Sequence, residues 1–197
     1  MRLFNIKTII LLLVLGTTLA NCSRKVTRVD VNEQIDLSGK WNDTDARLTA
    51  EKMTKQMTEE SWLTDFMQAN GGNKPVMIVG FVTNNSHEHI ESETFIKDIE
   101  RELILQQKVR IVQGGKKREQ IRLERAEQQD NASVSTMKKF GLEVGADFML
   151  QGSINSIVDQ IDKKRVVVYK IYLELTNIQT TETVWVGQEV IKKFIKR

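Results

Sequence analysis

The only two histidines of the chain, His87 and His89, flank Glu88 and are the side chains best suited to acid–base or metal chemistry. A metal site there would need further ligands from distant parts of the chain. No metalloprotease, nucleotide-binding or nucleophile-elbow motif accompanies the pair. We therefore interpret this stretch as a solvated polar loop, and we expect no metal ligands and no cofactor.

Two short serine motifs match parts of a penicillin-recognising active site. Residues 135–138 read S-x-x-K, and residues 153–155 read S-x-N. The third motif of such enzymes, K-T-G, does not follow, and Ser135 lies where a helix cap is expected. We interpret both matches as chance and predict no catalytic residues, so the chain is not expected to be an enzyme. An envelope hydrolase that uses His87 or Ser135 remains the least favoured alternative.

The composition is that of an ordinary globular protein rather than a nucleic-acid binder. The chain has 197 residues, of which 40% are hydrophobic, with 29 basic and 26 acidic side chains and a formal net charge of +3. This length fits one domain with appendages. The charge is too balanced for nucleic-acid binding, which usually needs a basic patch or stripe. A single cysteine excludes an internal disulfide.

The first residues have the architecture of a secretory signal. Arg2 and Lys7 form a basic region, and residues 9–15 (IILLLVL) form a short apolar run. This pattern is typical of a cleaved export signal rather than of a membrane-spanning helix. It predicts a signal peptide at residues 1–21 and a periplasmic location for the rest.

The single cysteine, Cys22, follows Leu19-Ala20-Asn21 in a context that resembles a bacterial lipobox. This resemblance implies that Cys22 is the lipid attachment site and carries acyl chains such as palmitate, which anchor a protein to a membrane. Ser23 and Arg24 provide no acidic retention signal, so we expect an outer-membrane lipoprotein facing the periplasm. The alternative is cleavage after Ala20, which would release a soluble exported protein.

We expect a tether at residues 22–40, leading helices at 41–72 and an α/β domain at 73–197. Asp43-Thr44-Asp45 is a helix start, and apolar residues follow it at helical spacing. Trp185 is expected in the core. Trp41 is interpreted as an anchor that packs the tether onto the domain, with a partner contact as the alternative.

Hydrophobic periodicity in residues 73–197 predicts a single mixed β-sheet flanked by helices, in the order β-α-β-α-α-β-β-β. Helical crossovers make the first strands parallel, and hairpins make the last ones antiparallel. The expected strands span residues 76–82, 109–112, 148–158, 167–176 and 183–192. The expected helices span residues 92–106 and 116–129, with a further helix capped by Ser133 whose Met137, Phe140 and Val144 face inward.

Five segments carry a resemblance to a known family. They are residues 36–45 (DLSGKWNDTD), the strand, loop and helix ending in 95–101 (FIKDIER), 124–129 (ERAEQQ), 140–154 (FG…GADFMLQGSI), and 173–177 (LELTN) with 184–187 (VWVG). Together they resemble the LpoB family, the lipoprotein activators of penicillin-binding proteins. The segment at 36–45 separates this family from other domains of the TolB N-terminal type.

The resemblance implies a TolB N-terminal-domain-like fold and a regulatory role in peptidoglycan synthesis. Such activators dock on an accessory domain of a bifunctional penicillin-binding protein and stimulate it allosterically, without catalysis of their own. The alternative is a component of an oligomeric, CsgG-like secretion or envelope assembly. From the residues we predict these partner contacts: Asn84, Asn85, His87, His89, Arg110 and Arg122.

Overall fold

The structure is a computed structural model that describes residues 26–31, 33–133, 135–136, 138 and 143–196. It separates into two compact units, residues 1–33 and 34–197. The described residues of the first unit form neither helix nor strand. No described helix is long and apolar enough to cross a bilayer. The signal peptide and Cys22 lie outside the described residues, so the lipid attachment site stays a prediction.

The second unit begins with helix α2, Asp43–Glu59, followed by α3, Ser61–Ala69. Asn42 is the N-cap of α2: its side chain accepts a hydrogen bond from the backbone of Asp45, whose side chain accepts one from the backbone of Asn42. This capping box satisfies two of the N–H groups that a helix start leaves without partners. The apolar residues expected on one face of α2 are all buried: Ala46, Ala50, Met53 and Met57.

Five strands form one mixed sheet in the order β2-β1-β3-β4-β5. The strands are β1 (Val76–Asn85), β2 (Arg110–Ile111), β3 (Phe148–Ile161), β4 (Lys164–Asn177) and β5 (Thr183–Lys196). Strand β1 pairs in parallel with β2 and β3, whereas β3–β4 and β4–β5 are antiparallel. The predicted mixed sheet, with parallel strands first and hairpins last, is confirmed.

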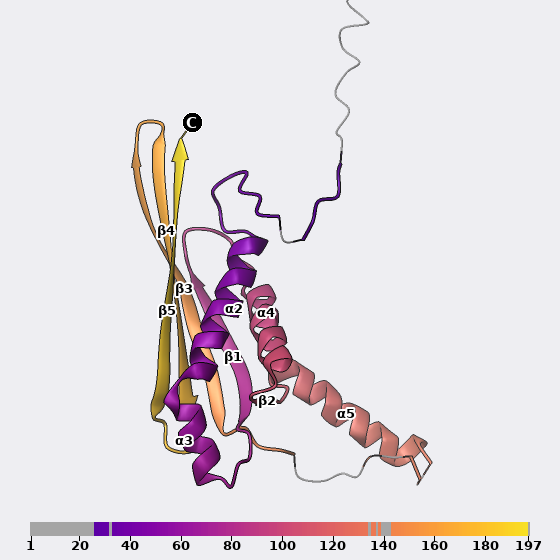
Figure 1. Ribbon diagram of the computed structural model, residues 1–197. Coiled ribbons are helices and arrows are strands. Elements are labelled where there is room, and N and C mark those ends of the chain that lie inside the picture. Colours follow the sequence, from indigo (N-terminus) through magenta and orange to yellow (C-terminus); the bar gives the residue numbers. More distant parts are fainter. Residues whose placement is uncertain (1–25, 32, 134, 137, 139–142, 197) are drawn as a thin grey trace, which may run out of the picture. The chain divides into compact units, whose positions relative to one another are not determined.

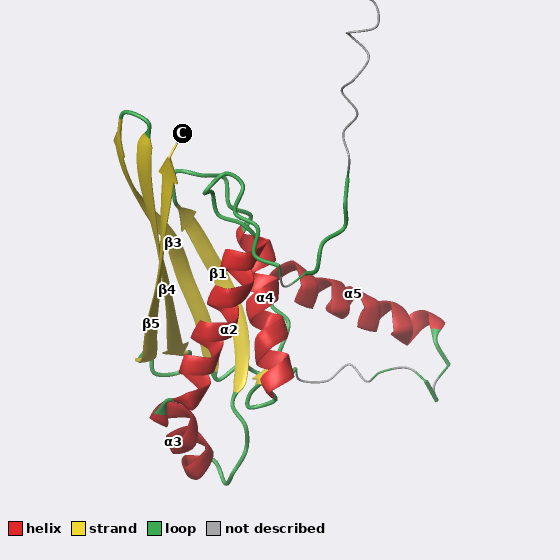
Figure 2. Ribbon diagram, turned by 45° about the horizontal axis from the view of Figure 1, so that its top comes forward, coloured by secondary structure: helices red, strands yellow, loops and turns green. Residues whose placement is uncertain are grey.

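Helices α2 and α4 (Ser92–Gln106) lie against the same face of the sheet (Figure 2). The buried side chains between helices and sheet include Met53, Ile99, Leu103, Tyr169 and Ile171, each 0% exposed. Trp185 belongs to this core, as predicted. Helix α5, Gly115–Asn131, is rich in charged side chains and has no buried residue, as is usual for a solvated helix.

Three boundaries differ from the expectation. Asn84 and Asn85, predicted to lie in a loop, end β1, because Ile154 and Asn155 of β3 provide hydrogen-bonding partners for them. Strands β3, β4 and β5 extend beyond their predicted ends toward the β3–β4 turn, because pairing between neighbouring strands continues to Ile161, Lys164 and Lys196. Of the helix expected after Ser133, Met137 and Phe140 lie outside the described residues; Ser135 and Thr136 form a turn, and Val144 is exposed.

Candidate partner-binding surface

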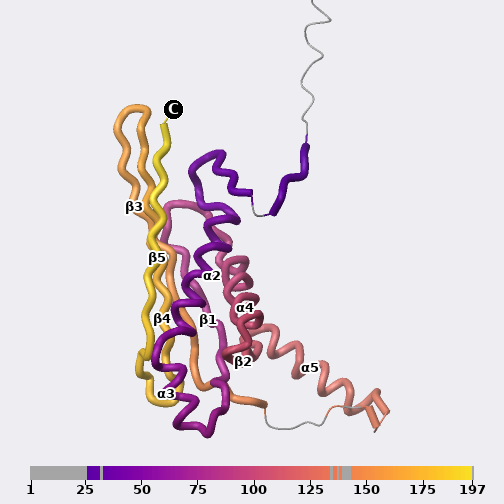
Figure 3. Tube along the Cα trace, in the orientation of Figure 1, coloured from indigo at the N-terminus to yellow at the C-terminus, as the bar shows by residue number. Residues whose placement is uncertain are grey.

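Residues 36–42, here called the entry segment, run from the end of the predicted tether to the start of α2. They lie beside the C-terminal end of β5 (Figure 3). Their backbone turns at Gly39, which has a φ of +68° and lies directly against the side chain of Ile195. The last residues of the predicted tether are therefore part of the domain.

The entry segment is joined to β5 by Lys193. The Lys193 ammonium lies 2.7 Å from Asp36 Oδ1 and 2.6 Å from Asp45 Oδ2, and donates a 2.9 Å hydrogen bond to the carbonyl of Lys40. Its side chain is only 7% exposed. Burial lowers the pKa of Lys193, but hydrogen bonds to the two carboxylates outweigh burial and hold it above its ordinary value. Lys193 therefore stays protonated, and the two carboxylates balance its positive charge.

Trp41 makes the second connection between the entry segment and the domain. Its backbone N–H donates to Glu88 Oε2 and to the hydroxyl of Tyr169, both at 3.1 Å. Its ring makes edge contacts with Phe95 and Tyr169, with centroids 6.0 and 5.6 Å apart. Such edge-to-face pairs add to the stabilisation from burial. The interpretation of Trp41 as a packing anchor is confirmed.

Tyr169 links the sheet to the loop that carries the two histidines. Burial is the main reason that the pKa of its hydroxyl lies well above the ordinary value, and a hydrogen bond to Glu88 adds to the shift. The hydroxyl therefore keeps its proton. It accepts from the N–H of Trp41 while donating to Glu88.

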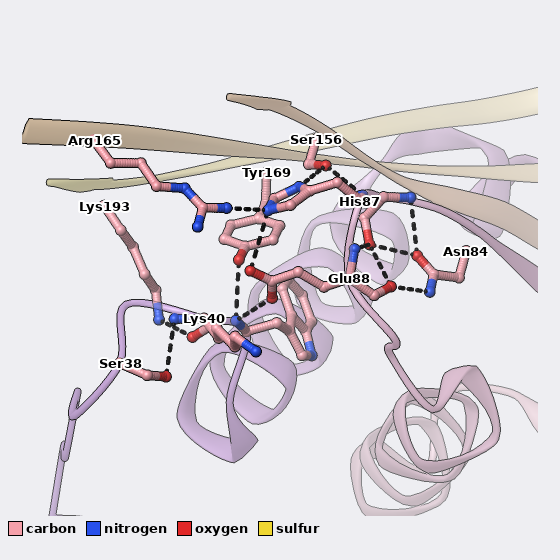
Figure 4. A network of polar contacts seen from close by, with 11 residues as sticks. Ser38, Lys40, Asn84, His87, Glu88, Ser156, Arg165, Tyr169 and Lys193 are labelled. Carbon is pink, nitrogen blue, oxygen red and sulfur yellow. Dashed lines mark hydrogen bonds and ion pairs between the residues drawn. The ribbon is translucent and has the colours of Figure 1, made fainter. Parts of the chain in front are cut away.

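His87 lies within a network of polar contacts between the loop and the β3–β4 hairpin (Figure 4). Its Nε2 lies 2.5 Å from an Arg165 guanidinium nitrogen and 3.2 Å from Glu88 Oε1, while its Nδ1 lies 2.6 Å from Ser156 Oγ. His87 is thus held by the domain rather than extended from it.

A pocket of about 780 Å³ opens between the entry segment, this loop and the β3–β4 turn. Its lining includes four basic and two acidic side chains: Lys40, Lys163, Arg165, Lys196, Glu88 and Asp162. The buried Nε of Arg165 finds no hydrogen-bond partner among the described residues. The charged side chains that line the pocket are therefore predominantly basic.

The other loop residues predicted to contact a partner have different surroundings. Asn84 donates to the carbonyls of Glu88 and Ile90, so it shapes the loop. Asn85 lies 3.4 Å from Asn155 across the β1–β3 pair. His89 is exposed. Of this group, His89 and Asn85 have side chains at the surface, and a contact role for any of them stays a prediction.

Arg110 and Arg122 lie elsewhere. Arg110 is exposed in β2 and pairs with Val76, the first residue of β1. The loop with the two histidines begins after Asn85, the last residue of β1. Nine steps of strand separate these points by about 30 Å. Arg122 of α5 forms a two-pronged ion pair with Glu143, at 3.0 and 3.1 Å. The hydrogen bond from Arg122 lowers the pKa of Glu143. The structure therefore does not bring the predicted contacts together on one surface.

Within the described residues, no group of three or more His, Cys, Asp or Glu side chains could hold a metal ion. Ser135 lies in a surface turn and Ser153 lies within β3. The network around His87 and Lys193 joins parts of the domain to one another. The class that fold and site define is an α/β domain with a closely packed N-terminal entry segment and exposed surfaces for binding.

Comparison with known families identifies that class more closely. The sequence model of the peptidoglycan-synthase activator LpoB matches residues 45–191, so the chain belongs to the LpoB family. This family consists of activators rather than enzymes. No curated protein sequence matched the chain.

Several solved structures are similar to this chain at less than 20% sequence identity. The LpoB C-terminal domain from Escherichia coli is 17% identical, with 76% of this chain and 99% of that one covered and a TM-score of 0.46. The NMR structure of E. coli LpoB is 15% identical, covering 88% and 87%, with a TM-score of 0.43. Lipoprotein GNA1162 from Neisseria meningitidis is 11% identical, covering 61% and 83%, with a TM-score of 0.40.

Proposed function

We propose that this protein is a lipid-anchored regulator in the outer membrane that binds and activates a bifunctional penicillin-binding protein from the periplasmic side. The observation that carries the proposal is the match of residues 45–191 to the family of peptidoglycan-synthase activators. The signal architecture and Cys22 support the anchored location, because the partner would also face the periplasm.

Activation by such a protein is a matter of differential binding. A regulator raises synthase activity only if it binds the active conformation more tightly than the resting one. A tenfold shift toward the active form requires a difference of about 1.4 kcal/mol in binding free energy. The regulator consumes no substrate and needs no cofactor for this role.

The entry segment supports this role by defining where the tether leaves the domain. Lys193 holds Asp36, and Trp41 is held by Glu88 and Tyr169, so the chain leaves beside the end of β5. A lipid anchor at Cys22 would then restrict how far the domain moves from the membrane.

The test is a glycan polymerisation assay with the purified bifunctional penicillin-binding protein of the same organism. We expect the chain from Ser23 onward to raise the polymerisation rate several-fold at saturation, with half-saturation at the binding constant measured separately. The chain alone should show no turnover. Binding without stimulation, or no binding at micromolar concentrations, would contradict the proposal. Sedimentation of the chain as large rings would instead favour the oligomeric assembly.

A further inference from the structure

Strands β3–β5 have a face that no described element covers. Along β4, Val167, Tyr169 and Ile171 point to the helices and are 0% exposed. Because side chains alternate along a strand, Val168 and Lys170 point the other way. Helices α2 and α4 lie on the Tyr169 side of these strands (Figure 2). We call the opposite side of β3–β5 the outer face.

The outer face carries many apolar side chains for a surface without a cover. Their exposed fractions run from 41% for Tyr172 to 70% for Val186 and Ile161, with Ile157, Val190 and Phe194 between these values. The pairing of strands places Ile157 opposite Val168, and Val166 opposite Phe194. Extended apolar patches of this kind on a soluble domain usually mark an interaction site.

A hollow of about 270 Å³ interrupts the outer face. It is lined by Tyr172, Glu174 and Val186, with Gly152 and Gly187 among its other walls. A side chain at Gly152 would overlap with Leu173, and one at Gly187 would overlap with Trp185, so the buried side of the sheet requires both glycines. Its size suits one large side chain, and anchors in such pockets supply much of the binding energy of interfaces.

The charges of the outer face are mainly positive. Strand pairing places four lysines on it, Lys164, Lys170, Lys192 and Lys196, against two acidic residues, Asp159 and Glu174. None of the four lysines has an ion-pair partner within the described part of the chain. A partner that placed carboxylates opposite them would gain charge complementarity, which chiefly increases association rate and specificity.

We infer that the outer face of β3–β5 is the docking surface for the synthase, and that the synthase presents there an apolar centre surrounded by acidic side chains. This inference rests on the proposed function and adds the surface and the chemistry of its partner. A second copy of this chain fits poorly, because a symmetric pair would oppose lysine-rich faces. An anionic bilayer would also attract the lysines, but a bilayer has no use for the hollow.

Two variants test the apolar and the charged parts of the outer face. Phe194→Asp removes an apolar contact, and its control is Leu123→Asp on α5, where the leucine is also 63% exposed. Lys164→Glu with Lys192→Glu reverses two charges, and its control is Lys55→Glu with Lys108→Glu, exposed lysines off the outer face. All four proteins should give the circular dichroism spectrum and unfolding midpoint of the wild type.

The measurement is binding of each variant to the purified bifunctional penicillin-binding protein, with the polymerisation rate recorded in parallel. We expect Phe194→Asp to weaken binding at least tenfold, and the double lysine variant to weaken it at least tenfold and flatten its dependence on salt. The controls should stay within about twofold of the wild type. Wild-type affinity in both outer-face variants would overturn the inference while leaving the proposed function intact.

A photocrosslinking residue in place of Tyr172 gives a readout that does not depend on affinity. We expect it to crosslink to the synthase in a region rich in Asp and Glu, whereas the same residue in place of Leu123 should not. Crosslinks between two copies of this chain would overturn the inference. So would sedimentation of the wild type, but not of Phe194→Asp, with vesicles of phosphatidylglycerol. If the wild type fails to bind the synthase at all, the proposed function fails, and this inference with it.

Discussion

Lys193 of β5 and Asp45 in the first turn of α2 form an ion pair with 2.6 Å between Nζ and Oδ2, and their side chains are only 7% and 8% exposed. The Asp45 carboxylate also accepts a 3.0 Å hydrogen bond from the backbone of Asn42. One carboxylate thus completes the capping box of α2 and attaches this helix to the last strand.

Removal of the Lys193 charge should destabilise the domain strongly. Lys193→Met leaves Asp36 and Asp45 without their cation, and breaking a buried pair from one side typically costs about 3–5 kcal/mol. We expect the free energy of unfolding in urea to fall by about that amount. The neighbouring exposed residue gives the control: Lys192→Met should change it by less than about 0.5 kcal/mol. Equal unfolding midpoints for the two variants would show that the pair adds nothing.

The same pair predicts a dependence on alkaline pH. The pKa of Lys193 is raised in the folded state, so its stabilising effect is complete below the pKa of a lysine in the unfolded chain, about 10.4. The effect is lost as the pH rises through the higher folded value. The difference in unfolding free energy between the wild type and Lys193→Met should therefore stay constant from pH 7 to about 10 and shrink above it. A difference that shrank instead between pH 9 and 7 would contradict this assignment.

The hydroxyl of Tyr169 should have a measurable effect that the hydroxyl of Tyr172 lacks. Tyr169→Phe removes a buried group that accepts from Trp41 and donates to Glu88, and we expect a loss of about 1–2 kcal/mol. Tyr172→Phe, on the outer face, should stay within about 0.5 kcal/mol of the wild type. Urea unfolding of both variants at neutral pH makes the comparison. Equal stability of the two would mean that the Tyr169 hydroxyl does not hold the entry segment.

A comparison of alanine substitutions at two glycines distinguishes the cost of backbone strain from the cost of disturbed packing in the entry segment. Gly39 and Gly71 have φ values of +68° and +62°, so alanine at either is strained by about 1 kcal/mol. A Cβ at Gly39 would also overlap with the side chain of Ile195, whereas one at Gly71 meets nothing. We expect Gly39→Ala to cost about 1–3 kcal/mol more than Gly71→Ala in thermal or urea unfolding. Equal costs would indicate that the entry segment does not rest on β5.

Much of the fold could be predicted because periodicity is a local property. The spacing of Phe95, Ile99 and Leu103 predicted α4 with its observed ends, and alternation from Val167 to Leu175 predicted β4. The order of helices and hairpins then predicted which strands are parallel. Strand ends were less predictable, since the extension of β1 to Asn85 depends on pairing with β3, far along the chain.

The sequence by itself therefore determined the family, most elements of this α/β domain and the direction of its strands, because the pattern of each element rests on residues close together in the chain. Only the tertiary structure decided what the polar side chains do. Lys193 and Asp36 are 157 residues apart and carry no local signal of their pairing. The contacts of His87 with Arg165 and Ser156 also join residues far apart in the chain, so no local pattern predicts them. Which side of β3–β5 stays uncovered likewise depends on where the helices pack, and packing is a property of the whole fold.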